Sequence, residues 1–171
     1  ICVKSKRGEG TCFTVTFEHR IADEECIELN QKLDVLDGKS VLQGKHVLLV
    51  EDNELNAEIA MAILEQSGLI LDRVEDGLAC INRLSEVDAD LYDLILMDIQ
   101  MPNVNGYEAT RRIRQFKNLK KASIPILAMT ANAFEEDKKM AMEAGMNGHI
   151  SKPIDVNALE NQIINLFKKV S

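Results

Sequence analysis

Leu94-Ile95-Leu96-Met97-Asp98 consists of four apolar residues followed by one acidic residue. A run that is apolar at every position suits a strand buried on both faces, as in a parallel sheet covered by helices on both sides. Val47-Leu48-Leu49-Val50 has the same character and is also followed by acidic residues. These two stretches predict a parallel sheet whose strands carry polar side chains at their carboxyl ends.

Five such strands are expected after residue 44, over residues 46–50, 70–74, 94–98, 124–129 and 148–151. Amphipathic stretches separate them, and strands that alternate with helices form βα units around a parallel sheet. The predicted fold class of this part is therefore α/β. Three of the helices carry one-sided apolar stripes that we expect to face the core. The stripes are Leu55, Ile59, Ala62 and Ile63 in the first helix, Ala109, Ile113 and Phe116 in the third, and Val156, Leu159, Ile163 and Leu166 in the last.

The composition limits the chain to one ordinary core and disfavours several classes of protein. With 171 residues, of which 46% are hydrophobic, one domain and an appendage are expected. A formal net charge of -8 argues against a nucleic-acid-binding surface, which requires clustered Lys and Arg. The four cysteines form no CxxC pair, which disfavours a zinc site. No apolar run reaches the roughly 20 residues that a transmembrane helix needs, and we expect a cytoplasmic location.

The first residues predict a β-hairpin. Alternating segments at residues 1–6 and 11–17 flank the turn-forming stretch Arg7-Gly8-Glu9-Gly10. Because an isolated hairpin is only marginally stable, we interpret it as the edge of another domain. The chain begins at Ile1 inside a predicted strand, so we expect further sequence to precede it. Residues 20–43 are polar and acidic without a sustained period and are interpreted as a linker.

Polar residues follow four of the five expected strands. Glu51 and Asp52 follow the first, Asp98 ends the third, and Thr130 and Lys152 follow the fourth and the fifth. In open α/β sheets, ligands bind at the carboxyl ends of the strands. Three carboxylates that meet there repel one another and are costly to desolvate, so a bound cation is expected. Hard oxygen ligands suit Mg²⁺.

Five motifs occur in order along the second part of the chain. They are Val50-Glu51-Asp52-Asn53, Leu96-Met97-Asp98-Ile99-Gln100-Met101-Pro102, Gly106-Tyr107, Ala128-Met129-Thr130-Ala131 and Ser151-Lys152-Pro153-Ile154. With these motifs, residues 45–170 resemble the receiver domain of two-component response regulators. The resemblance implies a flavodoxin-like, doubly wound, five-stranded parallel sheet with strand order 2-1-3-4-5, to which the N-terminal β-hairpin is an extension.

The resemblance also implies roles for the residues at the carboxyl edge of the sheet. By this resemblance, Asp98 would accept a phosphoryl group from phosphohistidine in a Mg²⁺-dependent reaction, and Lys152 and Thr130 would contact the phosphoryl oxygens. The implied Mg²⁺ ligands are Glu51, Asp52, Asp98 and the backbone carbonyl of Gln100. An exposed surface lysine is the alternative interpretation of Lys152, and a helix N-cap is the alternative for Thr130.

The family further implies a conformational switch and a means of setting the phosphoryl lifetime. The threonine is coupled there to an aromatic residue of the fifth strand. This chain has His149 at that position, where Tyr or Phe is commonest, so the switch is expected to be weaker or pH-sensitive; an exposed histidine at the strand edge is the alternative. Gln100 and Asn132 stand at the positions that flank the line of water attack in the family, and they are expected to tune the lifetime. The family usually has a cis peptide at the position of Lys152-Pro153.

The stretch Gly8-Glu9-Gly10-Thr11-Cys12-Phe13 is similar to the last glycine-rich box of the ATP-binding domain of histidine kinases, although a plain hairpin turn has the same pattern. The implied layout is that of a hybrid sensor histidine kinase. Residues 1–19 would be a remnant of the ATP-binding domain, 20–43 an acidic linker and 44–171 the receiver domain. We expect self-catalysed phosphoryl transfer but no kinase activity from this chain, within a parent kinase that can be membrane-anchored.

The implied partner is a histidine kinase dimerisation domain or a histidine phosphotransfer domain, docked on the first helix between Asn56 and Ile63, and a weak dimer is compatible with the family. Two other functions fit the residues less well. A Mg²⁺-dependent phosphohydrolase with an aspartate nucleophile needs an acid two residues after the nucleophile, where Gln100 stands. An interaction module that is not phosphorylated would lack acidic or acceptor residues, and this sequence has them all.

Overall fold

The computed structural model describes residues 2–6, 10–14, 41–131, 135–152 and 154–170. The chain divides into two compact units, Ile1–Asp34 and Val35–Ser171. In the first unit, β1 (Cys2–Lys6) and β2 (Gly10–Thr14) pair in antiparallel fashion, with Lys6 opposite Gly10. The antiparallel pair predicted for the first residues is thereby confirmed. The expected linker over residues 20–43 lies outside the described residues, except for residues 41–43.

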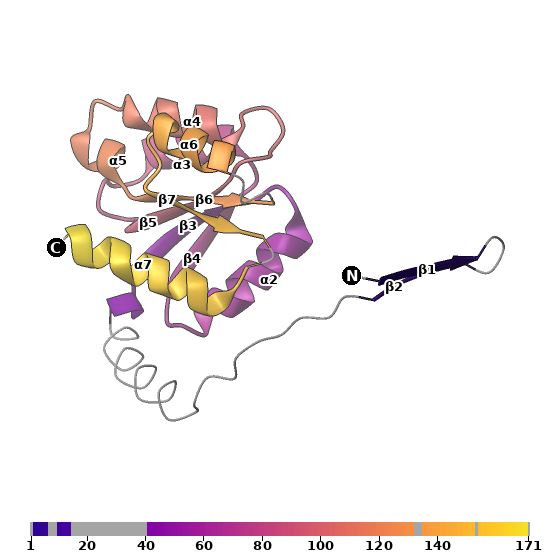
Figure 1. Ribbon diagram of the computed structural model, residues 1–171. Coiled ribbons are helices and arrows are strands. Elements are labelled where there is room, and N and C mark those ends of the chain that lie inside the picture. Colours follow the sequence, from indigo (N-terminus) through magenta and orange to yellow (C-terminus); the bar gives the residue numbers. More distant parts are fainter. Residues whose placement is uncertain (1, 7–9, 15–40, 132–134, 153, 171) are drawn as a thin grey trace. The chain divides into compact units, whose positions relative to one another are not determined.

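The second unit is built on a five-stranded sheet with the order β4-β3-β5-β6-β7 (Figure 1), and all its pairings are parallel. The strands are β3 (His46–Val50), β4 (Ile70–Val74), β5 (Leu94–Asp98), β6 (Ile126–Thr130) and β7 (Gly148–Ser151). Numbered within this unit, the order is 2-1-3-4-5, which confirms the flavodoxin-like, doubly wound sheet. The fourth of these strands begins at Ile126 rather than at Ile124, because Ile124 caps a helix and Pro125 has no backbone N–H for the ladder.

Helices cover both faces of this sheet (Figure 1). One face packs against α2 (Glu54–Glu65) and α7 (Val156–Val170), and the other against α3 (Gly77–Glu86), α4 (Gly106–Arg114) and α6 (Glu135–Ala144). A short helix, α5 (Leu119–Ser123), precedes β6. Among these described helices, none combines the length and the apolar character that crossing a membrane requires.

The two helical layers explain why residues 47–50 of β3 and 94–97 of β5 are apolar at every position. In β3, Val47 and Leu49 belong to the core beneath α2 and α7, whereas Leu48 and Val50 belong to the core beneath α3, α4 and α6. Successive side chains of a strand point to opposite faces of the sheet. A strand that lies between two layers of helices therefore buries all of its side chains, as β5 also does.

Asparagine or aspartate side chains begin four of the described helices by accepting a backbone N–H. These N-caps are Asn53 for α2, Asp76 for α3, Asn105 for α4 and Asn118 for α5. Such caps satisfy N–H groups that have no partner within the helix. Because Asn53 begins α2 directly after Asp52, the acidic pair at the end of β3 lies in a tight strand-to-helix connection.

The apolar stripe predicted for the core face of α2 lies on the opposite face of that helix. Leu55 and Ile59 are 64% and 51% exposed, and the core face consists of Ala57, Ala60 and Leu64. Both faces of α2 carry apolar residues, so periodicity alone does not determine which one is buried. The small side chains of Ala57 and Ala60 let the helix approach the sheet closely, which leaves the longer aliphatic side chains at the surface.

The stripes predicted on the other two helices are confirmed where the structure describes them. The buried members are Ala109 and Ile113 in α4 and Leu159, Ile163 and Leu166 in α7. Phe116, just beyond α4, packs against the core and is partly buried. The side chain of Val156 lies outside the described residues.

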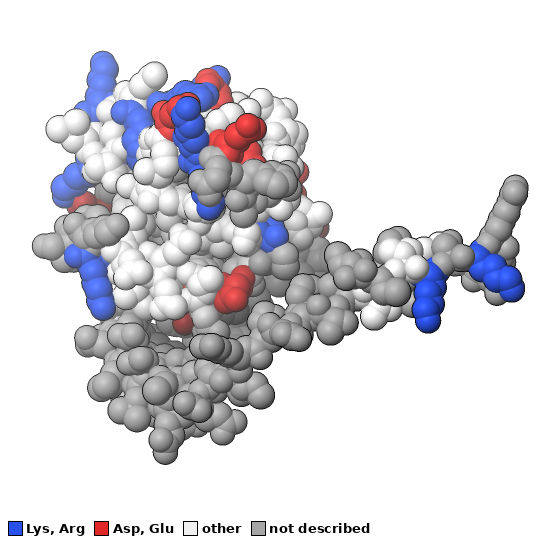
Figure 2. Space-filling view, in the orientation of Figure 1, with Lys and Arg blue, Asp and Glu red and all other residues white. Residues whose placement is uncertain are grey.

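Charged side chains of both signs share the surface of the second unit. Figure 2 shows Lys and Arg close to Asp and Glu over the helices at the top of the view. Two of the ion pairs of this unit are Arg112 with Glu108 and Lys120 with Asp90, each with a closest distance of 2.8 Å. Exposed pairs of this kind contribute roughly 0–1 kcal/mol each, so the stability of the fold depends mainly on its two cores.

Candidate functional site

The carboxyl edge of the sheet gathers buried polar side chains. Five polar or charged residues are buried in the part of the chain that the structure describes, and Glu51, Asp98 and Thr130 are three of them. Glu51 directly follows β3, Asp98 is the last residue of β5, and Thr130 is the last residue of β6. Asp52, the next residue after Glu51, is exposed. Buried polar groups require partners, so the contacts of these side chains define the site.

Three carboxylates at this edge lie close enough together to share one cation. One oxygen from each of Glu51, Asp52 and Asp98 lies within 4.8 Å of the other two. The backbone N–H of Gln100 donates to Asp98 Oδ1 over 3.1 Å, which holds this peptide next to the cluster. Hard oxygen donors are the ligands that Mg²⁺ takes in proteins. The residues present therefore fit the ion that the resemblance implies.

Lys152 places its ammonium group between the two buried carboxylates. Its Nζ atom lies 2.5 Å from Glu51 Oε2 and 2.6 Å from Asp98 Oδ2. The backbone N–H of Lys152 donates to the carbonyl of Thr130 over 2.7 Å, which fixes the start of the side chain at the end of the sheet. The side chain is 20% exposed, so the alternative of an exposed surface lysine is wrong.

For each member of this ion pair, burial and the charge of the partner shift the pKa in opposite directions. Burial has the largest effect on Asp98 and raises the pKa of its carboxyl group; the contacts with Lys152 and with the N–H of Gln100 partly offset that rise, and Glu51 adds to it. Burial lowers the pKa of Lys152, but hydrogen bonds and charge from Asp98 and Glu51 outweigh it, so the pKa of Lys152 is raised. The ammonium group therefore stays charged at neutral pH.

Asn56 completes the surroundings of Glu51. Its Nδ2 atom donates to Glu51 Oε1 over 3.0 Å, and the backbone carbonyl of Glu51 accepts from the Arg73 guanidinium at 3.3 Å. Asn56 lies in the first turn of α2, where the cap residue Asn53 accepts its backbone N–H. The sequence predicted Asn56 only as the start of a docking face. The signal that could have identified it is a polar residue one turn into a helix that begins directly after two acidic residues.

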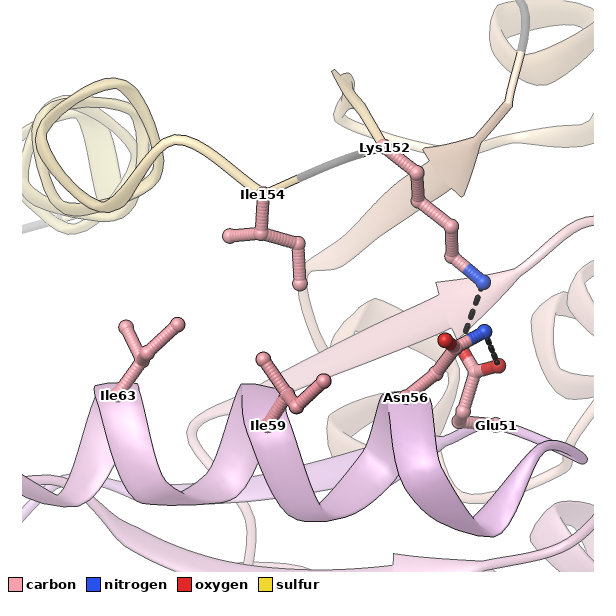
Figure 3. Close-up of a pocket in the computed structure, with 6 residues that line it drawn as sticks. All are labelled: Glu51, Asn56, Ile59, Ile63, Lys152 and Ile154. Carbon is pink, nitrogen blue, oxygen red and sulfur yellow. Dashed lines mark hydrogen bonds and ion pairs between the residues drawn. The ribbon is translucent and has the colours of Figure 1, made fainter.

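A pocket adjoins the carboxylates between α2 and the segment that follows β7 (Figure 3). Its lining residues are Glu51, Asn56, Ile59, Ile63, Lys152 and Ile154. Figure 3 shows the three isoleucines at one end and the three polar side chains at the other, where Asn56 and Lys152 both contact Glu51. The pocket therefore sets an apolar wall beside the charged edge of the sheet.

The loop after Asp98 is attached to the beginning of α3. Asn103 donates from Nδ2 to Asp76 Oδ2 over 2.7 Å, and the N–H of Gly77 donates to the carbonyl of Val104 over 3.2 Å. Asn103 has a φ of 59°, a left-handed conformation that asparagine tolerates better than most residues. A side chain at Gly77 would collide with the Val104 carbonyl. These contacts determine the path of the loop.

The other residues predicted for the site fall into two groups. Thr130 is 8% exposed at the end of β6, and Ala131, which follows it, is not helical. His149 lies in β7 and is half-buried rather than exposed, and its part in a switch stays a prediction. Asn132 and Pro153 lie outside the described residues, as does the peptide bond expected to be cis.

Proteins that are named as sensor kinases or histidine kinases are similar to the chain in sequence. Autoinducer 2 sensor kinase/phosphatase LuxQ of Vibrio parahaemolyticus is 38% identical over 167 residues, which cover 98% of this chain and 19% of the relative. Hybrid signal transduction histidine kinase L of Dictyostelium discoideum is 36% identical over 153 residues, which cover 88% of this chain and 8% of the relative. The chain thus spans a fifth or less of the length of these two proteins.

Solved structures resemble the second unit. The receiver domain of sensor histidine kinase PA1611 from Pseudomonas aeruginosa PAO1, with a magnesium ion coordinated in its active site cleft, is 37% identical, with a TM-score of 0.62 over 71% of this chain and 94% of that one. A co-crystal structure of the Saccharomyces cerevisiae histidine phosphotransfer protein Ypd1 and the receiver domain of Ssk1 contains a chain that is 30% identical, with a TM-score of 0.64 over 71% of this chain and 88% of that one.

The family model described as the response regulator receiver domain matches residues 47–164. This range contains four of the parallel strands completely, all of β3 except His46, the three carboxylates and Lys152. Because the match covers more than half of the chain and the strand order agrees with it, the chain belongs to the response regulator receiver domain family of two-component systems.

Proposed function

We propose that this receiver domain is a phosphoacceptor, in which Asp98 takes a phosphoryl group from a phosphohistidine with the help of Mg²⁺. One observation carries the proposal. The buried Asp98 carboxylate shares a 4.8 Å cluster of oxygens with Glu51 and Asp52, and the Lys152 ammonium lies 2.6 Å from it. A carboxylate acceptor, ligands for a cation and a fixed positive charge are the parts that phosphoryl transfer requires, since its catalysis is mostly positioning and charge stabilisation.

Each residue of the cluster has a proposed part in the transfer. Asp98 attacks phosphorus, so that an O–P bond forms while the N–P bond of the donor breaks and the donor imidazole takes up a proton. Glu51, Asp52, Asp98 and the carbonyl of Gln100 would hold Mg²⁺, which would supply positive charge to the transferring group. Lys152 exchanges one carboxylate contact for a phosphoryl oxygen, and the Thr130 hydroxyl donates to another.

After the transfer, we propose that signalling depends on the fourth and fifth strands of the sheet. Thr130 pairs with Ser151 in the β6–β7 ladder, which brings the Thr130 position next to the strand that carries His149. The effect of a contact between Thr130 and the phosphoryl group would then be transmitted to His149. The amide side chains of Gln100 and Asn132 are proposed to orient water and so to set the lifetime of the phosphorylated state.

The proposed partner is a histidine phosphotransfer domain or a kinase dimerisation domain, and its proposed docking face is the exposed stripe on α2. Leu55 and Ile59 of this stripe are more than half exposed, and Ile59 also lines the pocket beside the carboxylates. A phosphohistidine carried by a protein that covers this stripe would reach Asp98. The Ypd1–Ssk1 complex is a case of a receiver domain bound to a histidine phosphotransfer protein.

The proposed setting is a cytoplasmic receiver domain within a hybrid histidine kinase. Residues 1–19 would then come from the ATP-binding domain and residues 20–43 would link it to the receiver. LuxQ and hybrid kinase L support this layout, because they are a sensor kinase and a hybrid kinase that match 98% and 88% of the chain.

The direct test is phosphorylation by acetyl phosphate with Mg²⁺, followed by intact mass spectrometry. We expect the wild-type chain to gain one phosphoryl group, and Asp98→Ala to gain none. Chelation of Mg²⁺ should abolish the gain, whereas Asp90→Ala, which removes an exposed aspartate outside the site, should preserve it. A wild-type chain that gains no mass, or an equal gain by Asp98→Ala, would overturn the proposal.

A further inference from the structure

Both oxygens of the buried Glu51 carboxylate already have a donor. Glu51 is 2% exposed. Its Oε2 atom accepts from Lys152 over 2.5 Å, and its Oε1 atom accepts from Asn56 over 3.0 Å. Figure 3 shows that the two donors approach from different elements, Lys152 from the end of β7 and Asn56 from α2. The plane of the carboxylate is therefore fixed from two sides.

The two donors of Glu51 differ in what they share with the rest of the site. Lys152 also contacts Asp98, the proposed acceptor, so its ammonium group lies on the side of Glu51 where the cation would bind. A cation that approaches Oε2 therefore competes with Lys152. Asn56 binds the other oxygen and is not displaced by that exchange. Of these two contacts, the one from Asn56 is compatible with both the metal-free and the metal-bound site.

We propose that Asn56 is a positioning residue for the Mg²⁺ site and acts on it through Glu51; the inference rests on the phosphoacceptor function proposed above. By holding Oε1, the Asn56 amide keeps Oε2 directed at the shared space between Asp52 and Asp98. Groups that orient a metal ligand in this way contribute strongly to affinity, and their loss typically weakens metal binding by about 10–100-fold.

The location of Asn56 gives this contact a second consequence. Asn56 belongs to the helix that also carries the exposed stripe of Leu55 and Ile59, and it lines the same pocket as Ile59. A displacement of the first turn of α2 would therefore move the amide that orients Glu51. The metal site and the proposed docking face are thus connected through one side chain.

The test compares Mg²⁺ affinities of the full chain, obtained from the rise in unfolding temperature over a series of Mg²⁺ concentrations. A ligand that binds only the folded state stabilises it in proportion to the logarithm of its concentration above the Kd, so each series yields a Kd. We expect Asn56→Ala to weaken Mg²⁺ binding by about tenfold or more. The matched control is Asn161→Ala, an exposed position in α7, which should leave the Kd unchanged.

A double-mutant comparison separates positioning from a general effect on the fold. In a Glu51→Ala background, Asn56→Ala should cause no further loss of Mg²⁺ affinity, because the group through which it acts is gone. Circular dichroism of each metal-free variant checks that it unfolds cooperatively. A loss that persists in the Glu51→Ala background would overturn the proposal, as would an unchanged Kd for Asn56→Ala with a lowered metal-free unfolding temperature.

The outcome also distinguishes this inference from the proposed function. If wild-type chain is phosphorylated on Asp98 with Mg²⁺ and Asn56→Ala binds Mg²⁺ as tightly as wild type, only the role of Asn56 is wrong. If wild-type chain neither binds Mg²⁺ nor gains a phosphoryl group, the phosphoacceptor site itself is wrong, and the role of Asn56 with it.

Discussion

Lys152 Nζ lies 2.6 Å from Asp98 Oδ2 and at the same time 2.5 Å from Glu51 Oε2. One ammonium group thus compensates two carboxylates that the fold buries almost completely. The same contact holds positive charge beside the proposed acceptor before any phosphoryl donor arrives. Stability and the proposed reactivity of the site therefore depend on the same atom.

Replacement of Lys152 by alanine should destabilise the metal-free fold by about 3 kcal/mol, because it leaves buried carboxylates without their partner. Urea denaturation at neutral pH measures the loss. Lys152→Arg keeps the charge and serves as the control, which should lose less. Mg²⁺ should restore part of the stability of Lys152→Ala. A loss below about 0.5 kcal/mol would mean that the pair behaves like an exposed one.

A hydrogen-bonded carboxyl group on the edge strand β4 should make stability depend on pH. The Tyr92 hydroxyl donates to Asp72 Oδ2 over 2.6 Å, and this bond is the largest of the effects that lower the pKa of Asp72, followed among the lowering effects by Arg83 and His46. A carboxyl group with a lowered folded pKa stabilises the fold above its unfolded pKa, near 3.8, and this contribution is lost as the pH falls through the folded value.

Tyr92→Phe should therefore lose about 1 kcal/mol of unfolding free energy at neutral pH, which is below the roughly 1.5–3 kcal/mol of a bond to a charged group because Asp72 is partly exposed. The difference from wild type should shrink as the pH is lowered below 3.8, where Asp72 is protonated in the unfolded chain. Denaturation curves at neutral and acidic pH provide the measurement. An equal difference at both pH values would assign the contribution of Tyr92 to packing alone.

The meeting of Glu51, Asp98 and Lys152 at one edge could be predicted because each ends or directly follows an expected strand, and parallel strands end at the same edge. The buried face of α2 could not, since Leu55 and Leu64 are equally apolar and only contact with the sheet separates them. The bond from Asn56 to Glu51 also depends on where the first turn of α2 lies over the strand end. No periodicity or spacing encodes that position.

The stability that the Asn103–Asp76 bond gives to the loop after Asp98 should be measurable by substitution of these two side chains. Asn103→Ala removes the bond to Asp76 and leaves an alanine at a φ of 59°, whereas Asn103→Gly removes the bond alone. The alanine variant should therefore be less stable than the glycine variant by about 1 kcal/mol. Both variants should also accept a phosphoryl group more slowly from acetyl phosphate, because the loop carries Gln100.

Asp76→Ser supplies the matching change on the other side of that bond. Serine keeps the N-cap of α3 but offers no second oxygen to Asn103. Asp76→Ser combined with Asn103→Gly should then cost less than the sum of the two single changes. Strict additivity of their unfolding free energies would mean that the Asn103–Asp76 bond contributes nothing to stability.

Substitutions on the two faces of α2 should differ in their cost to stability. Leu55→Ser, at a position that is 64% exposed, should change the free energy of unfolding by less than about 0.5 kcal/mol. Leu64→Ala, on the buried face, should cost about 3 kcal/mol.

In phosphotransfer from a phosphorylated histidine phosphotransfer protein, Leu55→Ser should be slow, because it removes apolar surface from the proposed docking face. Labelling by acetyl phosphate needs no docking and should proceed at the wild-type rate. Equal slowing with both donors would place the defect in the acceptor site, and a normal rate with the protein donor would move the docking face away from Leu55.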